Sequence, residues 1–262
     1  MQLTSTHNPL LKRIRRAAES GRPTDDGLIV IEGPHLVQEA LKGEWRVQQI
    51  LATPEARELY DELLRNAGCE VVEVARRAFA STAATKNSQE LLALLQPRAW
   101  TWDDLTSGSS LVVVLDGIQD PGNAGTIVRS AEAFGATGVV FLNGCARVAN
   151  GKLLRATAGS IFRLPYLETV TAAELIADMQ AEDVTLYALA ASAVTSVADV
   201  DFRQKCALVV GSEGTGLSSV ISAEAQAVRI PTRNVESLNA AIACSIALFL
   251  AQQRRETYHE PV

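Results

Sequence analysis

Three polar segments in the C-terminal half of the chain carry the residue types that could do chemistry. The first contains Asn123 and, six positions later, Arg129. The second contains Glu213, and the third contains Ser237 and Asn239. Amide, carboxylate and hydroxyl groups can hold a polar ligand, and the arginine fork is suited to phosphate. Because each segment follows an apolar strand-like run, and such loops meet at one edge of a parallel sheet, the three predict a single pocket.

The glycine pattern of these segments argues against several enzyme classes. Residues 211–216 read G-S-E-G-T-G, which lacks the lysine of a nucleoside-triphosphate loop and the central nucleophile of G-x-S-x-G. The first segment contains P-G-N-A-G, which does not match G-x-G-x-x-G. The sequence therefore disfavours a triphosphatase and a hydrolase, and it leaves a dinucleotide oxidoreductase as a distant alternative.

Each candidate residue also has a purely structural interpretation. Asn123 could be the N-cap of the helix after the first segment, and Ser237 could cap a helix over residues 237–253. Glu213 could brace its loop or lie at a helix terminus, and Arg129 could form a surface ion pair. Asn239, just inside the last predicted helix, is less easily explained by helix propensity.

The elements that must position these residues form an alternating pattern in the second half of the chain. Strands are expected at residues 111–115, 138–142, 184–190, 207–210 and 227–230. Helices are expected at about residues 124–134, 152–158, 172–181 and 237–253. The strands are valine-rich and continuously apolar, which is typical of a parallel sheet covered on both faces.

The first half of the chain predicts a separate, smaller α/β domain over residues 1–97. A helix should follow Asn8-Pro9, and strands are expected at residues 28–31, 47–51 and 70–74, with helices from Pro34 and at residues 54–66. Residues 91–95 fit a last strand, although a helix has the same apolar pattern. Residues 98–110 predict a linker or an entry strand, and residues 111–262 form the second domain.

Composition narrows the setting of the protein. The 262 residues are 47% hydrophobic and 21% charged, which suits a packed α/β core. No apolar run predicts a membrane span or a signal peptide, and the four cysteines lack metal-ligand spacing. We therefore expect a cytoplasmic protein with no metal site and no membrane partner.

Charge is distributed unevenly along an acidic chain of net charge −6. Residues 7–22 contain one acid, Glu19, and five cations: Lys12, Arg13, Arg15, Arg16 and Arg22. A local basic stripe suits a partner whose phosphates touch one face, although a solvated helix face explains the stripe equally well.

Taken together, the three segments resemble the SpoU (TrmH-like) family of RNA ribose 2′-O-methyltransferases, of the SPOUT class. The family's first motif has an asparagine and, six residues later, an arginine, as in N-A-G-T-I-V-R from Asn123 to Arg129. Its second motif, G-S-E-G-x-G-L-S, is matched by residues 211–218. Its third, I-P followed by E-S-L-N, is matched by Ile230-Pro231 and residues 236–239.

The resemblance implies a fold, a cofactor and partners. It implies a C-terminal α/β trefoil-knot domain with a parallel sheet, preceded by a small ribosomal-protein-like α/β domain that binds RNA. It also implies S-adenosylmethionine as cofactor, structured RNA, ribosomal in the first instance, as substrate, and a homodimer; no DNA partner is expected.

The resemblance further assigns roles to individual residues. Cofactor contacts fall on Gly211, Gly214, Ile230 and Leu238, and catalytic roles fall on Asn123, Arg129, Glu213, Ser237 and Asn239. RNA contacts fall on Arg129 and on Lys12, Arg13 and Arg16 of the basic stripe. A guanidinium stays protonated at physiological pH, so we expect Arg129 to orient RNA rather than accept a proton, and the identity of the general base stays open.

The chain departs from the family pattern in the third segment. Residues 232–236 form a loop one residue shorter than in many members, without the glycine often found there. Asn234 tolerates a left-handed backbone and can take the place of that glycine. A SPOUT enzyme that methylates a base, and an RNA-binding assembly factor without catalysis, remain alternatives.

Overall fold

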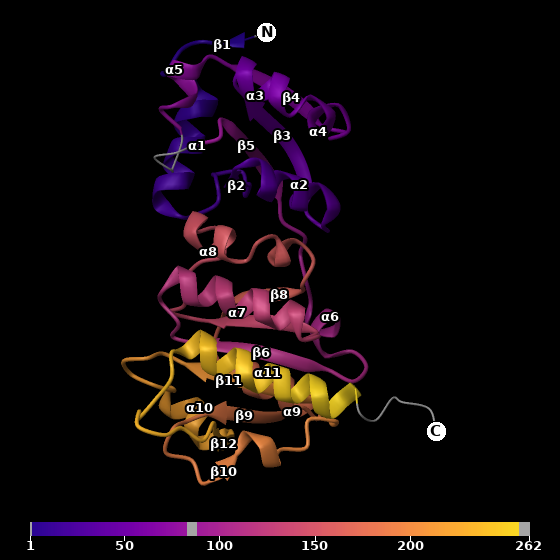
Figure 1. The fold of residues 1–262 in the computed structure, drawn as a ribbon, viewed down its shortest axis with the longest axis vertical. Coiled ribbons are helices and arrows are strands. Elements are labelled where there is room, and N and C mark those ends of the chain that lie inside the picture. Colours follow the sequence, from indigo (N-terminus) through magenta and orange to yellow (C-terminus); the bar gives the residue numbers. More distant parts are fainter. Residues whose placement is uncertain (1, 83–87, 257–262) are drawn as a thin grey trace. The chain divides into compact units, whose positions relative to one another are not determined.

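The computed structural model describes residues 2–82 and 88–256, and it divides into two compact units. The first unit consists of Met1–Ala99 together with Arg147–Arg163, and the second of Trp100–Ala146 and Leu164–Val262 (Figure 1). Within the described ranges, no helix is long and apolar enough to cross a membrane.

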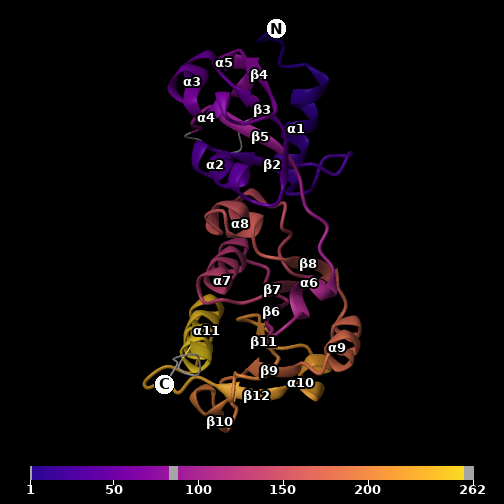
Figure 2. The same ribbon diagram turned by 90° about the vertical axis from the view of Figure 1, so that its right-hand side faces the viewer.

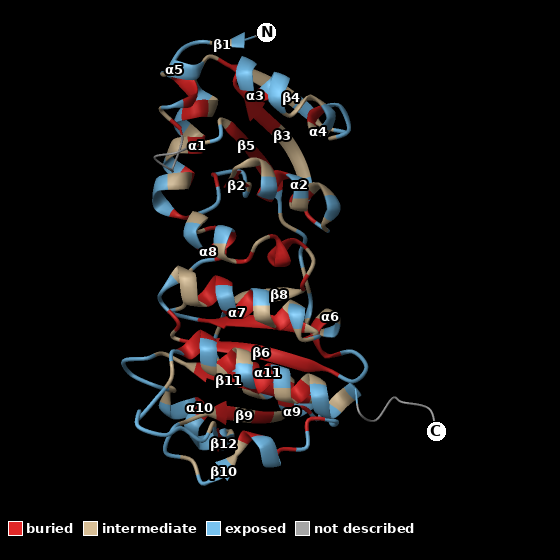
Figure 3. Cartoon of the chain, viewed as in Figure 1, coloured by how far each residue is buried: buried red, intermediate tan, exposed pale blue. Residues whose placement is uncertain are grey.

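A seven-stranded sheet forms the centre of the second unit. Its order is β10-β12-β9-β11-β6-β7-β8, and every neighbouring pair is parallel. The strands are β6 (Leu111–Asp116), β7 (Gly138–Leu142), β8 (Tyr166–Val170), β9 (Thr185–Leu189), β10 (Thr195–Ser196), β11 (Cys206–Gly211) and β12 (Gln226–Arg229). The parallel sheet predicted from the valine-rich runs is confirmed. Figure 3 shows β6 and β11 buried, as expected for strands covered on both faces.

Helices cover both faces of this sheet. The helices are α6 (Trp102–Thr106), α7 (Pro121–Ala133), α9 (Ala172–Ala181), α10 (Ser219–Glu224) and α11 (Ala240–Glu256). On one face, Leu105 of α6, Leu175 of α9 and Ile221 of α10 share a core with alternate residues of the strands. On the other face, α7 and α11 lie side by side (Figure 2). The hydroxyls of Ser130 in α7 and Ser245 in α11 are 2.7 Å apart.

The last turn of α11 is tied to the sheet by one arginine. The Arg255 guanidinium donates to the carbonyl oxygens of Phe202, Ser109, Ser110 and Gln204 at 2.7–3.0 Å. These carbonyls lie beside the amino ends of β6 and β11, and the Ser110 carbonyl also accepts from the Cys206 backbone N–H at 3.1 Å. Arg255 therefore joins the helix to two segments that are distant in sequence.

Replacing Arg255 with alanine should lower the free energy of unfolding by about 3 kcal/mol, because several charge-assisted hydrogen bonds are lost and the carbonyls of the buried residues Phe202 and Ser110 lose a charged donor. Denaturant unfolding measures the change. The matched control is Arg254→Ala, since Arg254 donates one hydrogen bond, to the Ala198 carbonyl, and should cost less than about 1 kcal/mol. Equal losses in the two variants would contradict this role of Arg255.

The first unit contains a five-stranded mixed sheet with the order β1-β4-β3-β5-β2. Its strands are β1 (Gln2–Leu3), β2 (Ile29–Glu32), β3 (Arg46–Ala52), β4 (Glu70–Val74) and β5 (Leu91–Gln96). Its helices are α1 (Pro9–Ser20), α2 (Pro34–Lys42), α3 (Pro54–Leu59), α4 (Asp61–Arg65), α5 (Arg76–Phe79) and α8 (Gly151–Ala156). Asn8 caps α1 through its side chain, as the Asn-Pro signal predicted.

A segment from the second half of the sequence belongs to this first unit. Arg147–Arg163 contains α8 and the short 3-10 helix Ser160–Phe162. Phe162 makes an edge-to-face contact with Trp45 at 5.1 Å between centroids, and Arg163 forms a 2.7 Å ion pair with Glu39. The sequence predicted one domain boundary, near residue 97, and did not predict that Arg147–Arg163 belongs to the first unit.

The structure corrects several predicted elements. Residues 98–110 are not a simple linker, because a Thr101–Asp104 capping box starts α6 and Leu105 is fully buried. The helix predicted at residues 54–66 is divided at Tyr60, which ends α3 and precedes α4. The edge strand β8 was missed, because it is only half-buried and Thr169 interrupts it with a positive φ.

Candidate active site

The three polar segments meet at the carboxyl edge of the parallel sheet. The strands β6, β11 and β12 end at Asp116, Gly211 and Arg229, and each is followed by one of the segments. Gly211 lies opposite Asp116 in the register of β11 and β6. The convergence predicted from sequence is therefore present, and parallel strand direction is its cause.

Side chains from all three segments form one hydrogen-bonded cluster. The Glu213 Oε1 atom accepts from Asn123 Nδ2 at 3.1 Å and from Asn239 Nδ2 at 2.6 Å. Asn239 Nδ2 also donates to Asn123 Oδ1 at 3.2 Å. The backbone N–H of Ala240 donates to the same Glu213 oxygen at 3.4 Å. We name Asn123, Glu213 and Asn239 the amide–carboxylate cluster.

The helix caps differ from those predicted. Asp120, not Asn123, caps α7 by accepting from the Asn123 backbone N–H at 2.8 Å. Asn239, not Ser237, accepts from Ala241 and Ile242 at the start of α11, which begins at residue 240. The Asn123 amide is thereby left to bind Glu213, whose carboxylate lies near the positive ends of two helices.

A pocket of about 530 Å³ opens beside this cluster, within the size range of cofactor sites. It is lined from the ends of β9, β11 and β12 and from the loops that follow them, which include the second and third polar segments but not the first. Five of the predicted site residues line it: Gly211, Glu213, Ile230, Ser237 and Leu238. Gly214 is exposed on the second loop and is not among the described residues that line the pocket.

The second loop has a compact backbone that depends on glycine. Ser212 and Gly216 exchange two backbone hydrogen bonds of 3.0–3.1 Å, and Gly216 has a φ of +70°. A Cβ on Gly211 would lie 2.6 Å from the Gly216 carbonyl carbon, which is closer than real Cβ contacts. Only glycine fits position 211 while the loop keeps this form.

Asp116 is a site-forming residue that the sequence analysis missed. It is only 8% exposed, and its Oδ2 accepts from the Ser218 backbone N–H at 2.7 Å, at the far end of the second loop. The available signal was an acid at the last position of an apolar strand, directly before the first polar segment. That signal is weak, because many strands end on a polar residue.

The third loop uses the residue expected to replace glycine. Asn234 has a φ of +64°, so the prediction that it adopts a left-handed backbone is confirmed. The Thr232 hydroxyl donates to the Val235 carbonyl at 2.9 Å and closes the short turn around Asn234. The shortened loop therefore still reaches the pocket, which Thr232 and Glu236 also line.

Arg129 is not part of the amide–carboxylate cluster. It is exposed on α7, almost two turns beyond Asn123, and no described residue forms a hydrogen bond or an ion pair with it. An unpaired guanidinium on the helix that begins at the cluster is available to a phosphate of a bound partner.

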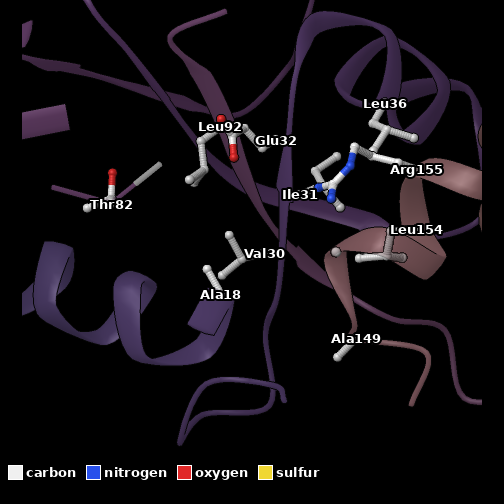
Figure 4. Close-up of a pocket in the computed structure, with 11 residues that line it drawn as sticks. Ala18, Val30, Ile31, Glu32, Leu36, Thr82, Leu92, Ala149, Leu154 and Arg155 are labelled. Atoms are coloured by element: carbon white, nitrogen blue, oxygen red, sulfur yellow. The ribbon is translucent and has the colours of Figure 1, made fainter. Parts of the chain in front are cut away.

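A second, very small pocket lies within the first unit between α1, β2 and α8. Figure 4 shows Ala18 and Val30 on one side of it and Leu154 and Arg155 on another. Its volume of about 20 Å³ has room for roughly one water molecule, which excludes a cofactor. The pocket of the second unit, at about 530 Å³, is large enough for a nucleoside-sized ligand.

The basic stripe on α1 is partly neutralised. Arg13 pairs with Asp26 at 3.1 Å and Arg16 with Asp25 at 3.7 Å, all on the surface of the first unit. Lys12 is exposed and has no ion-pair partner among the described residues. The stripe therefore presents fewer unpaired cations than the sequence suggests.

The cysteines near the sheet are not candidates for a nucleophile. Burial raises the pKa of the Cys145 and Cys244 thiols, so both stay protonated at neutral pH. The Cys145 Sγ donates to the Leu115 carbonyl at 3.2 Å. In the described part of the chain, no three His, Cys, Asp or Glu side chains are arranged to hold a metal ion.

Two family models match the chain. Residues 110–249, more than half of the sequence, match the SpoU rRNA Methylase family, and residues 8–93 match the MRM3-like substrate binding domain.

Known proteins resemble the chain along nearly its whole length. It is 31% identical over 258 residues to an uncharacterized tRNA/rRNA methyltransferase of Synechocystis, covering 97% of this chain and 94% of the relative. It is 29% identical to the 23S rRNA (guanosine(2553)-2′-O)-methyltransferase RlmP of Bacillus subtilis, covering 95% and 98%. The AdoMet complex of the SpoU methyltransferase AviRb from Streptomyces viridochromogenes superimposes with a TM-score of 0.87 at 25% identity, covering 96% and 99%.

Proposed function

This chain belongs to the SpoU rRNA methylase family, and we propose that its pocket binds S-adenosylmethionine for methyl transfer to a ribose 2′-hydroxyl of ribosomal RNA. The observation that carries the proposal is the amide–carboxylate cluster, which joins all three loops at the rim of a pocket of cofactor size. The substrates named for relatives such as RlmP support ribosomal RNA as the acceptor.

The pocket residues fit S-adenosylmethionine in size and charge. The charged lining residues are Glu213, Glu236 and Arg229, a net charge of −1, which complements a cofactor of net charge +1. Backbone groups of Gly211, Ile230 and Leu238, which line the pocket, would hold the cofactor. The cofactor supplies an electrophilic methyl group on sulfonium.

In this proposal, the residues of the chain position the reactants and form no covalent bond with them. Asn123 and Asn239 hold Glu213 in place, and Ser237 lies at the pocket wall. We assign to Arg129 the orientation of the RNA backbone, because its fork has no protein partner among the described residues. Positioning of the hydroxyl against the methyl group supplies most of the acceleration in such a displacement.

Nucleoside mass spectrometry tests the proposed function. Total RNA from cells with and without the gene is digested and compared, and loss of one 2′-O-methylnucleoside from ribosomal RNA is expected. Loss of a base-methylated nucleoside would indicate a base methyltransferase instead. An unchanged RNA together with no S-adenosylmethionine binding in calorimetry would favour an assembly factor.

The proposed RNA contacts on α1 predict a change in salt dependence. The double variant Lys12→Ala/Arg16→Ala should reduce the slope of log affinity for ribosomal RNA against log salt by about 1.6, since two phosphate contacts are lost. The control is Arg57→Ala/Arg77→Ala, which removes two exposed cations of the same unit from α3 and α5. An unchanged slope in the first variant would remove α1 from the RNA contact surface.

We also propose a homodimer formed through α11. Ile242, Ile246 and Phe249 lie on one face of the helix at helical spacing, and Ile242 is 53% exposed. Apolar side chains at such spacing are typical of a face that a partner covers.

Ile242→Glu should therefore convert the dimer to a monomer, because a carboxylate would be buried without a partner in the interface. Light scattering after size exclusion measures the mass. Leu59→Glu is the control, since Leu59 is 73% exposed on the first unit, outside the proposed interface. A monomeric wild-type chain, or a dimeric Ile242→Glu variant, would contradict the proposed interface.

The trefoil knot and the cytoplasmic location remain proposals. The path of the chain supports the knot. The strand β12 lies next to β9, on the side away from β11, and the chain then returns past these strands so that α11 packs on β11 and α7. The cytoplasm is the compartment where ribosomal RNA substrates and S-adenosylmethionine occur together.

A further inference from the structure

The segment from the second half of the sequence that belongs to the first unit is strongly basic. Arg147–Arg163 contains no Asp or Glu, although the net charge of the whole chain is −6. It contains four cations: Arg147, Lys152, Arg155 and Arg163. The match to the MRM3-like substrate binding domain covers residues 8–93, so the segment lies outside the part of the chain that this match assigns to substrate binding.

The side chains of this segment divide into a buried apolar set and an exposed cationic set. Leu153, Leu154 and Phe162 are at most 1% exposed. Arg147 and Arg155 are exposed, and no described residue forms a hydrogen bond or an ion pair with either guanidinium. A solvated helix face usually mixes charges of both signs, so an outer face that carries cations alone indicates an anionic partner.

The segment lies directly beside the end of α1. A Cβ on Gly21, which ends α1, would lie 3.2 Å from the Nδ2 atom of Asn150, which caps α8. Ala18 of α1 and Arg155 of α8 line the same small pocket (Figure 4). The Arg147 carbonyl accepts from the Asn150 backbone N–H at 3.0 Å, so Arg147 lies in the turn just before α8. The cations of α1 and of α8 are therefore carried by neighbouring helices of one unit.

We propose that Arg147 and Arg155 bind phosphates of the RNA that contacts α1, so that the RNA-binding surface of the first unit is built from both halves of the sequence. This inference rests on the proposed function, which supplies ribosomal RNA as the partner. The guanidinium fork matches phosphate oxygens, and contacts to phosphate fix the orientation of an RNA without reading its sequence.

The position of Arg155 suits such a contact. It lines the small pocket together with Ile31 and Leu36, and it is exposed to solvent at the same time. An arginine in this setting covers apolar surface with its stem and keeps its charge in water. The stem therefore restrains the guanidinium before RNA binds, which lowers the entropy cost of the contact.

The test is the salt dependence of RNA affinity in the full chain. In Arg147→Ala/Arg155→Ala, the slope of log affinity for ribosomal RNA against log salt should fall by about 1.4–1.8, because two phosphate contacts and their released counterions are lost. The loss of affinity should accordingly be about tenfold larger at 50 mM salt than at 200 mM. A slope within about 0.3 of wild type would overturn the proposal and make α8 a solvated helix face.

Two further variants separate a phosphate contact from other effects of the substitutions. Arg147→Lys/Arg155→Lys keeps both charges and both apolar stems, so its slope should stay close to that of wild type. The matched control, Arg57→Ala/Arg77→Ala, removes two exposed cations of the same unit from α3 and α5 and should leave the slope unchanged. A slope in either variant as low as in the alanine variant of α8 would overturn the proposal, because packing or overall charge would then be the cause.

Methylation by the wild-type chain tests the proposed function separately. A chain that methylates no ribose, but whose RNA affinity shows the expected difference in slope between wild type and Arg147→Ala/Arg155→Ala, would support the contact surface on α8 and contradict the proposed function.

Discussion

Arg129→Ala should reduce methyl transfer by about 100- to 1,000-fold while leaving the affinity for S-adenosylmethionine within about twofold of wild type. The reason lies in where Arg129 is placed. It is exposed on α7, outside the amide–carboxylate cluster and outside the pocket lining, so its removal disturbs no described contact. Its loss affects RNA orientation, which matters only once the substrate is bound.

Single-turnover rates and calorimetry measure the two effects separately. Arg129→Lys is the informative control, because lysine keeps the charge and loses the planar fork; it should recover only part of the rate. Since Arg129 lies on the same helix as Asn123, thermal unfolding should confirm that α7 is intact in both variants. A large loss of cofactor affinity in Arg129→Ala would show that the arginine serves the pocket and not the RNA.

Gly211→Ala should weaken S-adenosylmethionine binding at least about tenfold, which corresponds to about 1.4 kcal/mol. The new Cβ would lie 2.6–2.8 Å from three backbone atoms of Gly216 and Leu217. Backbone cannot move aside as a flexible side chain can, so the turn closed by Ser212 and Gly216 must open. Opening it displaces Glu213, which lies between these two residues.

Gly214→Ala is the matched control for Gly211→Ala. A Cβ at Gly214 meets no atom within 4 Å, and Gly214 does not line the pocket among the described residues. Its affinity for the cofactor should therefore stay within about twofold of wild type. Equal affinities of the two variants would contradict the role of the close-packed turn, and weakened binding in Gly214→Ala alone would restore the cofactor contact implied for that residue.

Most of the fold could be predicted from local sequence signals. The runs that became β6, β7 and β11 are continuously apolar and bounded by loop residues, and such strands are recognised reliably. Elements that depend on tertiary contacts were missed. The helix α6 is short, and it is stabilised by burial of Leu105 under Gly138, where a Cβ would be 2.3 Å from Leu105 Cγ.

For the candidate site, the sequence predicted which residues come together better than it predicted how they contact one another. Spacing and residue type identified Asn123, Glu213 and Asn239, and the structure places the three in direct contact. The helix-cap role that the sequence offered as an alternative for Asn123 and Ser237 was wrong, because cap preference depends on where a helix begins, and sequence locates helix ends poorly. Asp116 was overlooked because its partner, Ser218, lies at the end of a distant loop.

The sequence by itself determined the family, the order of the elements and the residues able to do chemistry, because motif spacing, apolar periodicity and residue type are local properties. Only the tertiary structure decided which oxygen of Glu213 is anchored, which glycine is sterically required and that Arg147–Arg163 belongs to the first unit. Each of these depends on distances between atoms that the chain brings together from far apart. Such distances arise from sheet register and packing, which no local pattern of residues encodes.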